Sequence, residues 1–284
     1  MPISVNRGAV ATVGSTLWDG PQASIQLCTV RLGDGATVGL LNLRSRNLNP
    51  VTTPVDTPAS DGGSLPERLG DALGRPRLRG WLHLYAFAVS IVGGIVLVAL
   101  AASRPGWAPL WSTLVYAVTV CGLFGISALY HRKLWGPRGY AVMKRLDHSM
   151  IFVFIAGTYT PFCVMLLPPS TAKTILAVVW GGAAAGVALK MLWPHAPKWL
   201  AIPLYIALGW VSVFMLPDLL AIGGVTIVTL LAAGGLAYTV GAVVYAVKRP
   251  NPWPATFAHH EIFHACTLVA AICHQVAVYF ALYH

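Results

Sequence analysis

Residues 82–103 read LHLYAFAVSIVGGIVLVALAAS and contain no charged residue. About 20 consecutive apolar residues suffice for a helix to cross the hydrocarbon core of a bilayer. Backbone groups in lipid must be satisfied within the segment, so an apolar run of this length is predicted to be helical. Six more such runs follow, separated by prolines, glycines and charges. The sequence predicts an all-α membrane protein, a seven-transmembrane helix bundle with spans at 82–103, 108–131, 146–167, 173–193, 199–217, 220–247 and 259–281.

The composition agrees with a membrane protein. Of the 284 residues, 56% are hydrophobic and 10% are charged, and the mean hydropathy is +0.68. A soluble domain usually carries about 25% charged residues. The net charge of +10 does not indicate a nucleic-acid partner, because the basic residues gather between apolar runs. The lipid bilayer is the expected surrounding, and the sequence leaves the oligomeric state open.

The distribution of these basic residues predicts the orientation. Cytoplasmic loops carry an excess of Lys and Arg. We therefore expect a multi-pass protein of the cell inner (plasma) membrane, with the N-terminus cytoplasmic and the C-terminus outside. The loops on the predicted outer side carry only Arg104 and Lys173. The predicted cytoplasmic side holds Arg75, Arg77, Arg79, Arg132, Lys133, Arg138, Lys144, Arg145, Lys190, Lys198, Lys248 and Arg249.

The first part of the chain has a different composition. Residues 1–79 are rich in Gly, Pro, Ser and Thr, and residues 49–65 read NPVTTPVDTPASDGGSL, which is typical of a linker. We predict an N-terminal cytoplasmic, largely disordered segment over 1–79, in which residues 24–30 could pair weakly as a strand. The seven-transmembrane domain is predicted to cover 80–284.

Polar residues inside predicted spans are costly and call for an explanation. Ser127 and His131 end the span 108–131, Asp147 opens the span 146–167, and His260 and His264 open the span 259–281. All lie at one predicted membrane depth. His260 and His264 are four residues apart and share a helical face. Three histidines and one open position are typical of catalytic zinc, with Asp147 placed to hold a zinc-bound water and Ser127 one turn before His131.

Other interpretations of these residues remain open. The stretch His260–His264 also fits the HExxH pattern of zinc proteases, in which Glu261 would be the general base. A histidine in a span can simply pack against a neighbouring helix. His274 is predicted to be a packing residue or to lie just behind the site. His83 is predicted to cap its helix at the interface, and His148 and His259 to be interfacial.

The chain resembles the hemolysin III family, the bacterial branch of the progestin and adiponectin-receptor superfamily. The resemblance rests on Ser127-x-x-x-His131, on the Leu146–Ser149 stretch (LDHS) running to GTYTP at 157–161, and on His260-x-x-x-His264, and it covers about 80–284. It implies the same fold and a zinc ion held by His131, His260 and His264, with Asp147 contacting the zinc-bound water and Ser127 in the same shell. It also implies that Glu261 is not a catalytic base.

The chain departs from the family's pattern before the first span. Many bacterial members carry a Glu and an Asn ahead of a His there, whereas Arg77-Leu-Arg-Gly-Trp-Leu-His83 keeps only the His. Whether the start of the first span contributes to the site is therefore left open by the sequence.

Two functions follow as expectations. The first is zinc-dependent hydrolysis of a membrane lipid amide or ester, with water activated by the metal. The alternative is a non-enzymatic protein, either a hemolysin-type pore-forming cytolysin or a receptor-like protein with structural zinc. The near absence of polar stripes outside the histidine cluster disfavours a wide pore.

Overall fold

The structure, a computed structural model, describes residues 3–5, 9–19, 23–31, 37–45, 76–193 and 197–284. The chain forms two compact units, Met1–Asp61 and Gly62–His284. The predicted linker over 49–65 lies outside the described residues.

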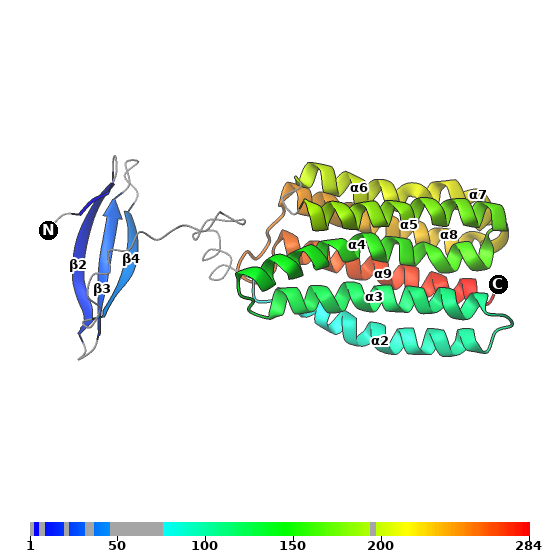
Figure 1. The fold of residues 1–284 in the computed structure, drawn as a ribbon, viewed down its shortest axis with the longest axis horizontal. Coiled ribbons are helices and arrows are strands. Elements are labelled where there is room, and N and C mark those ends of the chain that lie inside the picture. Colours follow the sequence, from blue (N-terminus) through cyan, green and yellow to red (C-terminus); the bar gives the residue numbers. More distant parts are fainter. Residues whose placement is uncertain (1–2, 6–8, 20–22, 32–36, 46–75, 194–196) are drawn as a thin grey trace. The chain divides into compact units, whose positions relative to one another are not determined.

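The first unit contains an antiparallel sheet. Strands β1 (Ile3–Val5), β2 (Ala9–Asp19), β3 (Ala23–Arg31) and β4 (Thr37–Ser45) pair in chain order (Figure 1). The pairing of β3 with β4 runs in register from Ala23 opposite Ser45 to Arg31 opposite Thr37. The sheet lies within the segment predicted to be largely disordered, and that description of 1–79 as a whole stays a prediction. The β-branched residues Ile25, Thr29 and Val30 of β3 favour a strand. The strand expected at residues 24–30 lies within β3.

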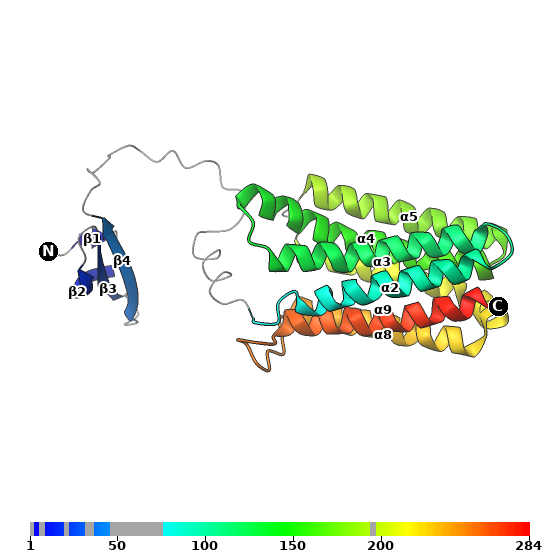
Figure 2. The ribbon, with the colours of Figure 1, turned by 90° about the horizontal axis from the view of Figure 1, so that it is seen from below.

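The second unit is a helical bundle (Figures 1 and 2). Most predicted helices begin and end within a few residues of their expected positions. The bounds are α2 (Trp81–Ala102), α3 (Ala108–Arg132), α4 (Pro137–Leu166), α5 (Pro169–Leu192), α6 (Lys198–Trp210), the 3₁₀ turn η1 (Val211–Met215), α7 (Leu216–Asp218), the π turn η2 (Leu219–Gly223), α8 (Gly224–Val247) and α9 (His259–Leu282).

One helix differs clearly from its prediction. α4 begins at Pro137 instead of residue 146. Proline suits the first helical position, where its missing N–H and fixed φ cost nothing. Hydropathy detects only the apolar part of a helix, so the charged turns that precede it were assigned to a loop. Lys144 and Arg145 therefore stand on a helix.

Among the described residues, six helical segments are long and apolar enough to cross a membrane: α2, α3, α4, α5, the run Leu200–Val247 and α9. The run Leu200–Val247 joins α6 and α8 through η1, α7 and η2. The prediction of a helical membrane bundle is confirmed. The count of seven spans and the orientation of the termini stay predictions.

Helices that follow one another in the chain pack side by side, and α9 closes the bundle by contacting α2, α3, α4 and α8. The interior is filled by large side chains, among them Tyr116, Phe124, Phe152 and Phe162. Many large apolar side chains face outward, as on α2, where Val89, Val92 and Ile95 are all more than half exposed. An outer surface of this kind suits contact with lipid tails.

Candidate metal centre

Two helices bring three histidines to one end of the bundle. His131 lies in the last turn of α3, and His260 and His264 lie in the first turns of α9. The end of α3 and the start of α9 lie at the same end of the bundle (Figures 1 and 2). His260 and His264 point to the same side because they are four residues apart on a helix.

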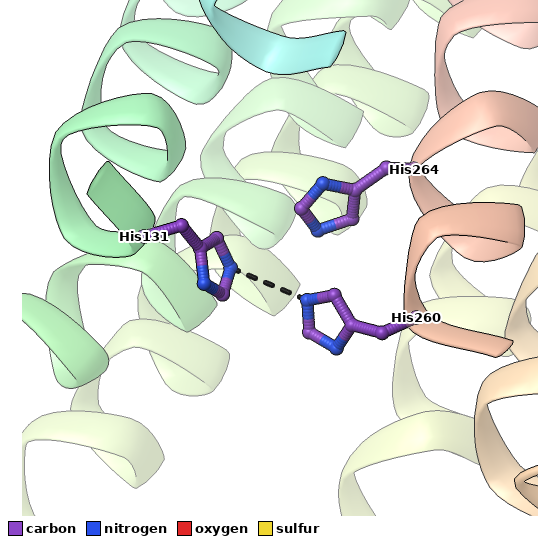
Figure 3. A group of neighbouring side chains, drawn as sticks. All are labelled: His131, His260 and His264. Atoms are coloured by element: carbon purple, nitrogen blue, oxygen red, sulfur yellow. Dashed lines mark hydrogen bonds between the residues drawn. The ribbon is translucent and has the colours of Figure 1, made fainter. Parts of the chain in front are cut away.

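The three imidazoles converge, and we call them the histidine triad. One ring nitrogen from each of His131, His260 and His264 lies within 4.8 Å of the other two. The Nε2 atoms of His131 and His260 are 3.3 Å apart (Figure 3). The His260 and His264 ring centroids are separated by 4.5 Å, and those of His131 and His264 by 5.2 Å. His264 is 3% exposed.

This spacing fits a tetrahedral metal ion. Zinc binds histidine nitrogen at about 2.0–2.1 Å, so two ligands of a tetrahedral ion lie about 3.3 Å apart. The His131–His260 separation has this value, and a small shift of a ring would bring His264 to it. The histidine triad lies within metal-binding distance, with His264 buried and His131 and His260 half-buried. Between His131 and His260 the same distance also allows a direct hydrogen bond, if one ring nitrogen carries a proton and the other does not.

His83 is a neighbour of the triad that the sequence analysis missed. Its ring stacks on His264 with centroids 3.8 Å apart and ring planes 6° apart, and it is 3% exposed. The prediction of an interfacial cap is therefore wrong, and the start of α2 lies beside the triad. The Phe124 ring packs edge-on against His83 at 5.1 Å. The sequence signal that could have identified His83 was its position as a histidine within an otherwise uncharged apolar run.

The segment before α2 crosses the end of the bundle beside the triad. Gly80 adopts a φ of +79°, and a Cβ at this position would lie 2.8 Å from the Cβ of His131. Glycine takes this left-handed conformation without the steric cost that other residues meet. The backbone N–H groups of Arg77 and Leu78 donate to the carbonyls of Ala255 and Thr256. This segment is therefore fixed to the chain that leads into α9.

Glu261 has a structural partner on that same segment. Its carboxylate accepts a hydrogen bond from the Arg79 guanidinium and another from the backbone N–H of Ala258. Its side chain is 2% exposed. An acidic residue at this position satisfies a free N–H group at the start of the helix and favours its dipole. Because both carboxylate oxygens are engaged, this geometry does not favour the zinc-protease interpretation.

Asp147 and Ser127 lie together but outside the triad. Asp147 lies on α4, and its carboxylate is within hydrogen-bonding reach of the Ser127 side chain on α3. The Asp147 Oδ2 atom is 3.7 Å from Nδ1 of His148, and the Asp147 side chain is 14% exposed. The structure thus places this pair near the same end of the bundle, and their catalytic roles stay predictions.

The remaining predicted histidines have separate surroundings. His148 has its Nδ1 atom 2.7 Å from the Lys144 carbonyl, and His259 has its Nδ1 atom 2.8 Å from the side-chain oxygen of Asn251. His274 is 9% exposed and lies in the bundle interior, where Tyr238 packs against it. None of these three belongs to the group of converging ligand atoms found within the described residues.

The sequence is similar to known membrane proteins. Residues 72–275 match the family described as Haemolysin-III related. The "Hemolysin-3 homolog" of Bacillus subtilis (strain 168) is 28% identical over 186 residues, covering 66% of this chain and 84% of the relative. "Hemolysin-3" of Bacillus cereus is 29% identical over 182 residues, covering 64% and 80%.

A plant protein is similar to the same extent. The "Heptahelical transmembrane protein ADIPOR2" of Oryza sativa subsp. japonica is 29% identical over 188 residues, covering 60% of this chain and 81% of the relative. Together with the six apolar helical segments, these matches show that the chain is a multi-pass protein of the cell membrane.

Proposed function

Because the chain belongs to the haemolysin-III-related family, we propose that it is a zinc-dependent hydrolase acting on a membrane lipid amide or ester. The observation that carries the proposal is the convergence of His131, His260 and His264 from two helices within one membrane bundle. Three histidines with an open position are the ligand set of catalytic zinc, and neutral imidazoles favour zinc over hard cations.

The chain's own residues have distinct roles in this proposal. His131, His260 and His264 hold the zinc ion, which when bound polarises a carbonyl and makes water a better nucleophile. Asp147 accepts a proton from the attacking water at a carboxylate oxygen and passes it to the leaving group. Ser127 donates to Asp147 and fixes its orientation. His83 keeps the His264 ring in place by stacking on it.

The location of the triad suggests that the substrate is a lipid. The triad lies at the end of a bundle whose outer surface carries many exposed apolar side chains. A lipid can reach such a site from within its leaflet without leaving the membrane, and its amide or ester lies near the depth where the apolar runs end.

We further propose seven spans, with the N-terminus and the triad on the cytoplasmic side. A straight helix of 48 residues would be roughly 72 Å long, more than twice the bilayer core of about 30 Å. The run Leu200–Val247 is interrupted between α6 and α8, Gly224 has a φ of +74°, and α6 contacts α8. The helix length, the interruption, the Gly224 conformation and the α6–α8 contact support two crossings within this run, and the loop charges support the orientation.

A second candidate is a non-enzymatic protein, either a pore-forming cytolysin or a receptor-like protein with structural zinc. The names of two relatives, Hemolysin-3 and Hemolysin-3 homolog, favour the cytolysin. A wide pore in one chain is disfavoured because large side chains such as Tyr116 and Phe152 fill the bundle interior. A structural zinc site would need a fourth protein ligand, and the cluster found among the described residues has three.

The metal content of the detergent-purified chain tests the proposal first. We expect about one zinc per chain in the wild type and none in a His260→Ala, His264→Ala double variant. The zinc content is measured by elemental mass spectrometry. Folding is followed in both samples by thermal unfolding and size-exclusion chromatography.

Hydrolysis is then measured with ceramides and phospholipids in mixed micelles. The Asp147→Asn variant is expected to keep its zinc. Its hydrolysis rate is expected to fall about 10²–10⁴-fold, because the substitution removes a proton acceptor. A folded wild type without metal would refute the zinc site. A zinc-loaded wild type that hydrolyses none of these lipids would favour the receptor-like alternative.

A further inference from the structure

A buried lysine lies near the triad end of the bundle without a matching anion. Lys190, in the last turn of α5, is 7% exposed. It forms no ion pair with any other residue in 76–193 or 197–284. Its electrostatic neighbours are Lys144 and His148, both on α4. A largely buried lysine beside another positive charge is costly unless an anion lies near it.

The described part of the helical unit, residues 76–193 and 197–284, has too few carboxylates to supply that anion. After Arg79 the sequence contains only Asp147, Asp218 and Glu261. Glu261 is paired with Arg79. Asp218 lies in α7, at the opposite end of the bundle (Figure 1). Asp147 remains. Its carboxylate lies 3.7 Å from Nδ1 of His148 and within hydrogen-bonding reach of Ser127, and it forms no ion pair with Lys190.

Arg145 adds a buried, unpartnered donor at this end of α4. Its Nε atom is buried and has no hydrogen-bond partner within the described residues. Buried guanidinium groups are normally engaged by carboxylate or phosphate oxygens. Two neighbouring cationic residues of α4, together with Lys190 of α5, therefore offer donors and positive charge. No acceptor for them is found within 76–193 and 197–284.

Tyr245 of α8 lies between these basic residues and the histidine triad, and it interacts with both. Its side chain interacts electrostatically with Asp147, Lys144 and Arg79. Its ring centroid lies 5.5 Å from that of His260, on the triad. A ligand held by the lysines would therefore lie next to the triad.

We propose that Lys144 and Lys190 bind the phosphate group of an anionic lipid beside the histidine triad. Lysine is a strong point-charge partner for phosphate, and basic pockets between transmembrane helices on the cytoplasmic side are suited to lipid head groups. The residues that follow Lys190 favour a lipid over free phosphate: Met191 is 41% exposed and Leu192 is 85% exposed, so the approach to the ammonium is apolar. The binding site does not depend on hydrolysis by the triad.

Lipid binding by the full chain tests the proposal. Phosphatidylglycerol and phosphatidylcholine with identical acyl chains are titrated into the detergent-purified protein, and bound lipid is counted by native mass spectrometry. We expect a preference for phosphatidylglycerol that falls about fivefold in Lys190→Gln and about fivefold in Lys144→Gln, the effect of about one surface charge each. Lys133→Gln is the matched control, because Lys133 is exposed in the turn after α3, and it is expected to leave the preference unchanged.

Each outcome decides the proposal. Equal binding of the two lipids by the wild type, or the same fivefold loss in Lys133→Gln, would overturn it in favour of a diffuse positive surface. Displacement of phosphatidylglycerol by millimolar inorganic phosphate, with no lipid preference left, would assign the site to soluble phosphate instead. Lys144 is exposed, so its variant is expected to fold even if Lys190→Gln does not, and phosphatidylcholine binding reports on folding in both.

The same samples separate this inference from the proposed function. If the wild type lacks zinc but keeps the phosphatidylglycerol preference, the hydrolase proposal fails and the phosphate site stands. If zinc is present and unchanged in Lys190→Gln while the lipid preference is absent in the wild type, the phosphate site fails alone.

Discussion

His264 and His274 lie on the same helix, α9, and both are buried, with exposures of 3% and 9%. Ten residues of helix separate them by about 15 Å. Around His264 three other histidines gather, with ring centroids at 3.8 Å for His83, 4.5 Å for His260 and 5.2 Å for His131. Around His274 lie the Tyr238 ring at 5.6 Å and the backbone of Gly234 and Ala270.

Burial alone therefore does not mark a site in this protein. A single buried histidine can be held by packing, as His274 is between α8 and α9. What distinguishes the region of His264 is the convergence of ring nitrogens from different helices within 4.8 Å. Only such convergence provides several ligands for one ion.

The largest expected difference between the two histidines is in metal content. His264→Gln is expected to reduce bound zinc from about one ion per chain to nearly none, because two remaining nitrogens hold zinc weakly. His274→Gln is expected to leave the metal content unchanged. Both variants are measured by elemental mass spectrometry after the same purification, and equal zinc in the two would contradict the comparison.

Acid is expected to release the metal from the wild type. Zinc requires neutral imidazoles, so protons compete with it, and affinity falls as the pH is lowered. A competition titration with a chromogenic chelator between pH 8 and pH 5 measures this. A metal affinity that does not change over this range would argue against ligation by three histidines.

The helical bundle and the grouping of the three triad histidines could be predicted from the sequence. The apolar runs have the length that a bilayer requires, and the four-residue spacing of His260 and His264 requires a shared face. His131 could be assigned to the same group because the end of α3 and the start of α9 are predicted to lie at the same membrane depth. The role of His83 was not predictable, since stacking on His264 depends on how the start of α2 packs against α9.

Charged positions at helix ends were the least predictable. Hydropathy marks where a helix enters lipid but not where its hydrogen bonding begins, so the first turns of α4 from Pro137 were assigned to a loop. Burial of Lys190 likewise depends on the α4–α5 contact. The sheet over residues 3–45 was underestimated because a composition rich in Gly, Ser and Thr outweighed short stretches of alternation.

Glu261→Gln tests the structural role of the acidic residue that lies between His260 and His264 in the sequence. We expect a loss of stability of about 1.5–3 kcal/mol, the value of a hydrogen bond to a charged group, because Arg79 loses its partner. Zinc content is expected to stay the same, and lipid hydrolysis to persist once protein concentration is corrected for folding. Stability is measured by thermal and denaturant unfolding in detergent. A complete loss of hydrolysis in a folded, zinc-loaded variant would restore the protease-like role of this carboxylate.

Two glycines allow the regions of His264 and His274 to be perturbed in parallel. A Cβ at Gly80 would lie 2.8 Å from the Cβ of His131, and a Cβ at Gly234 would lie 2.4 Å from Nε2 of His274. Alanine at either position is expected to cost about 1–3 kcal/mol of stability by overpacking. Only Gly80→Ala is expected to weaken zinc binding, because only it displaces a triad member. Unfolding and chelator competition are measured on both variants, and equal zinc affinities would contradict this expectation.

The smallest expected effect concerns the ring that stacks on His264. His83→Ala removes the stacked ring and is expected to lower zinc affinity about tenfold, the low end of the effect of residues that orient metal ligands. His83→Phe keeps an aromatic face of similar size and is expected to retain most of the affinity. A tenfold loss in both variants would instead show that a ring nitrogen of His83 matters, and His83 would then belong among the ligands. Chelator competition on the two variants separates orientation by stacking from direct ligation.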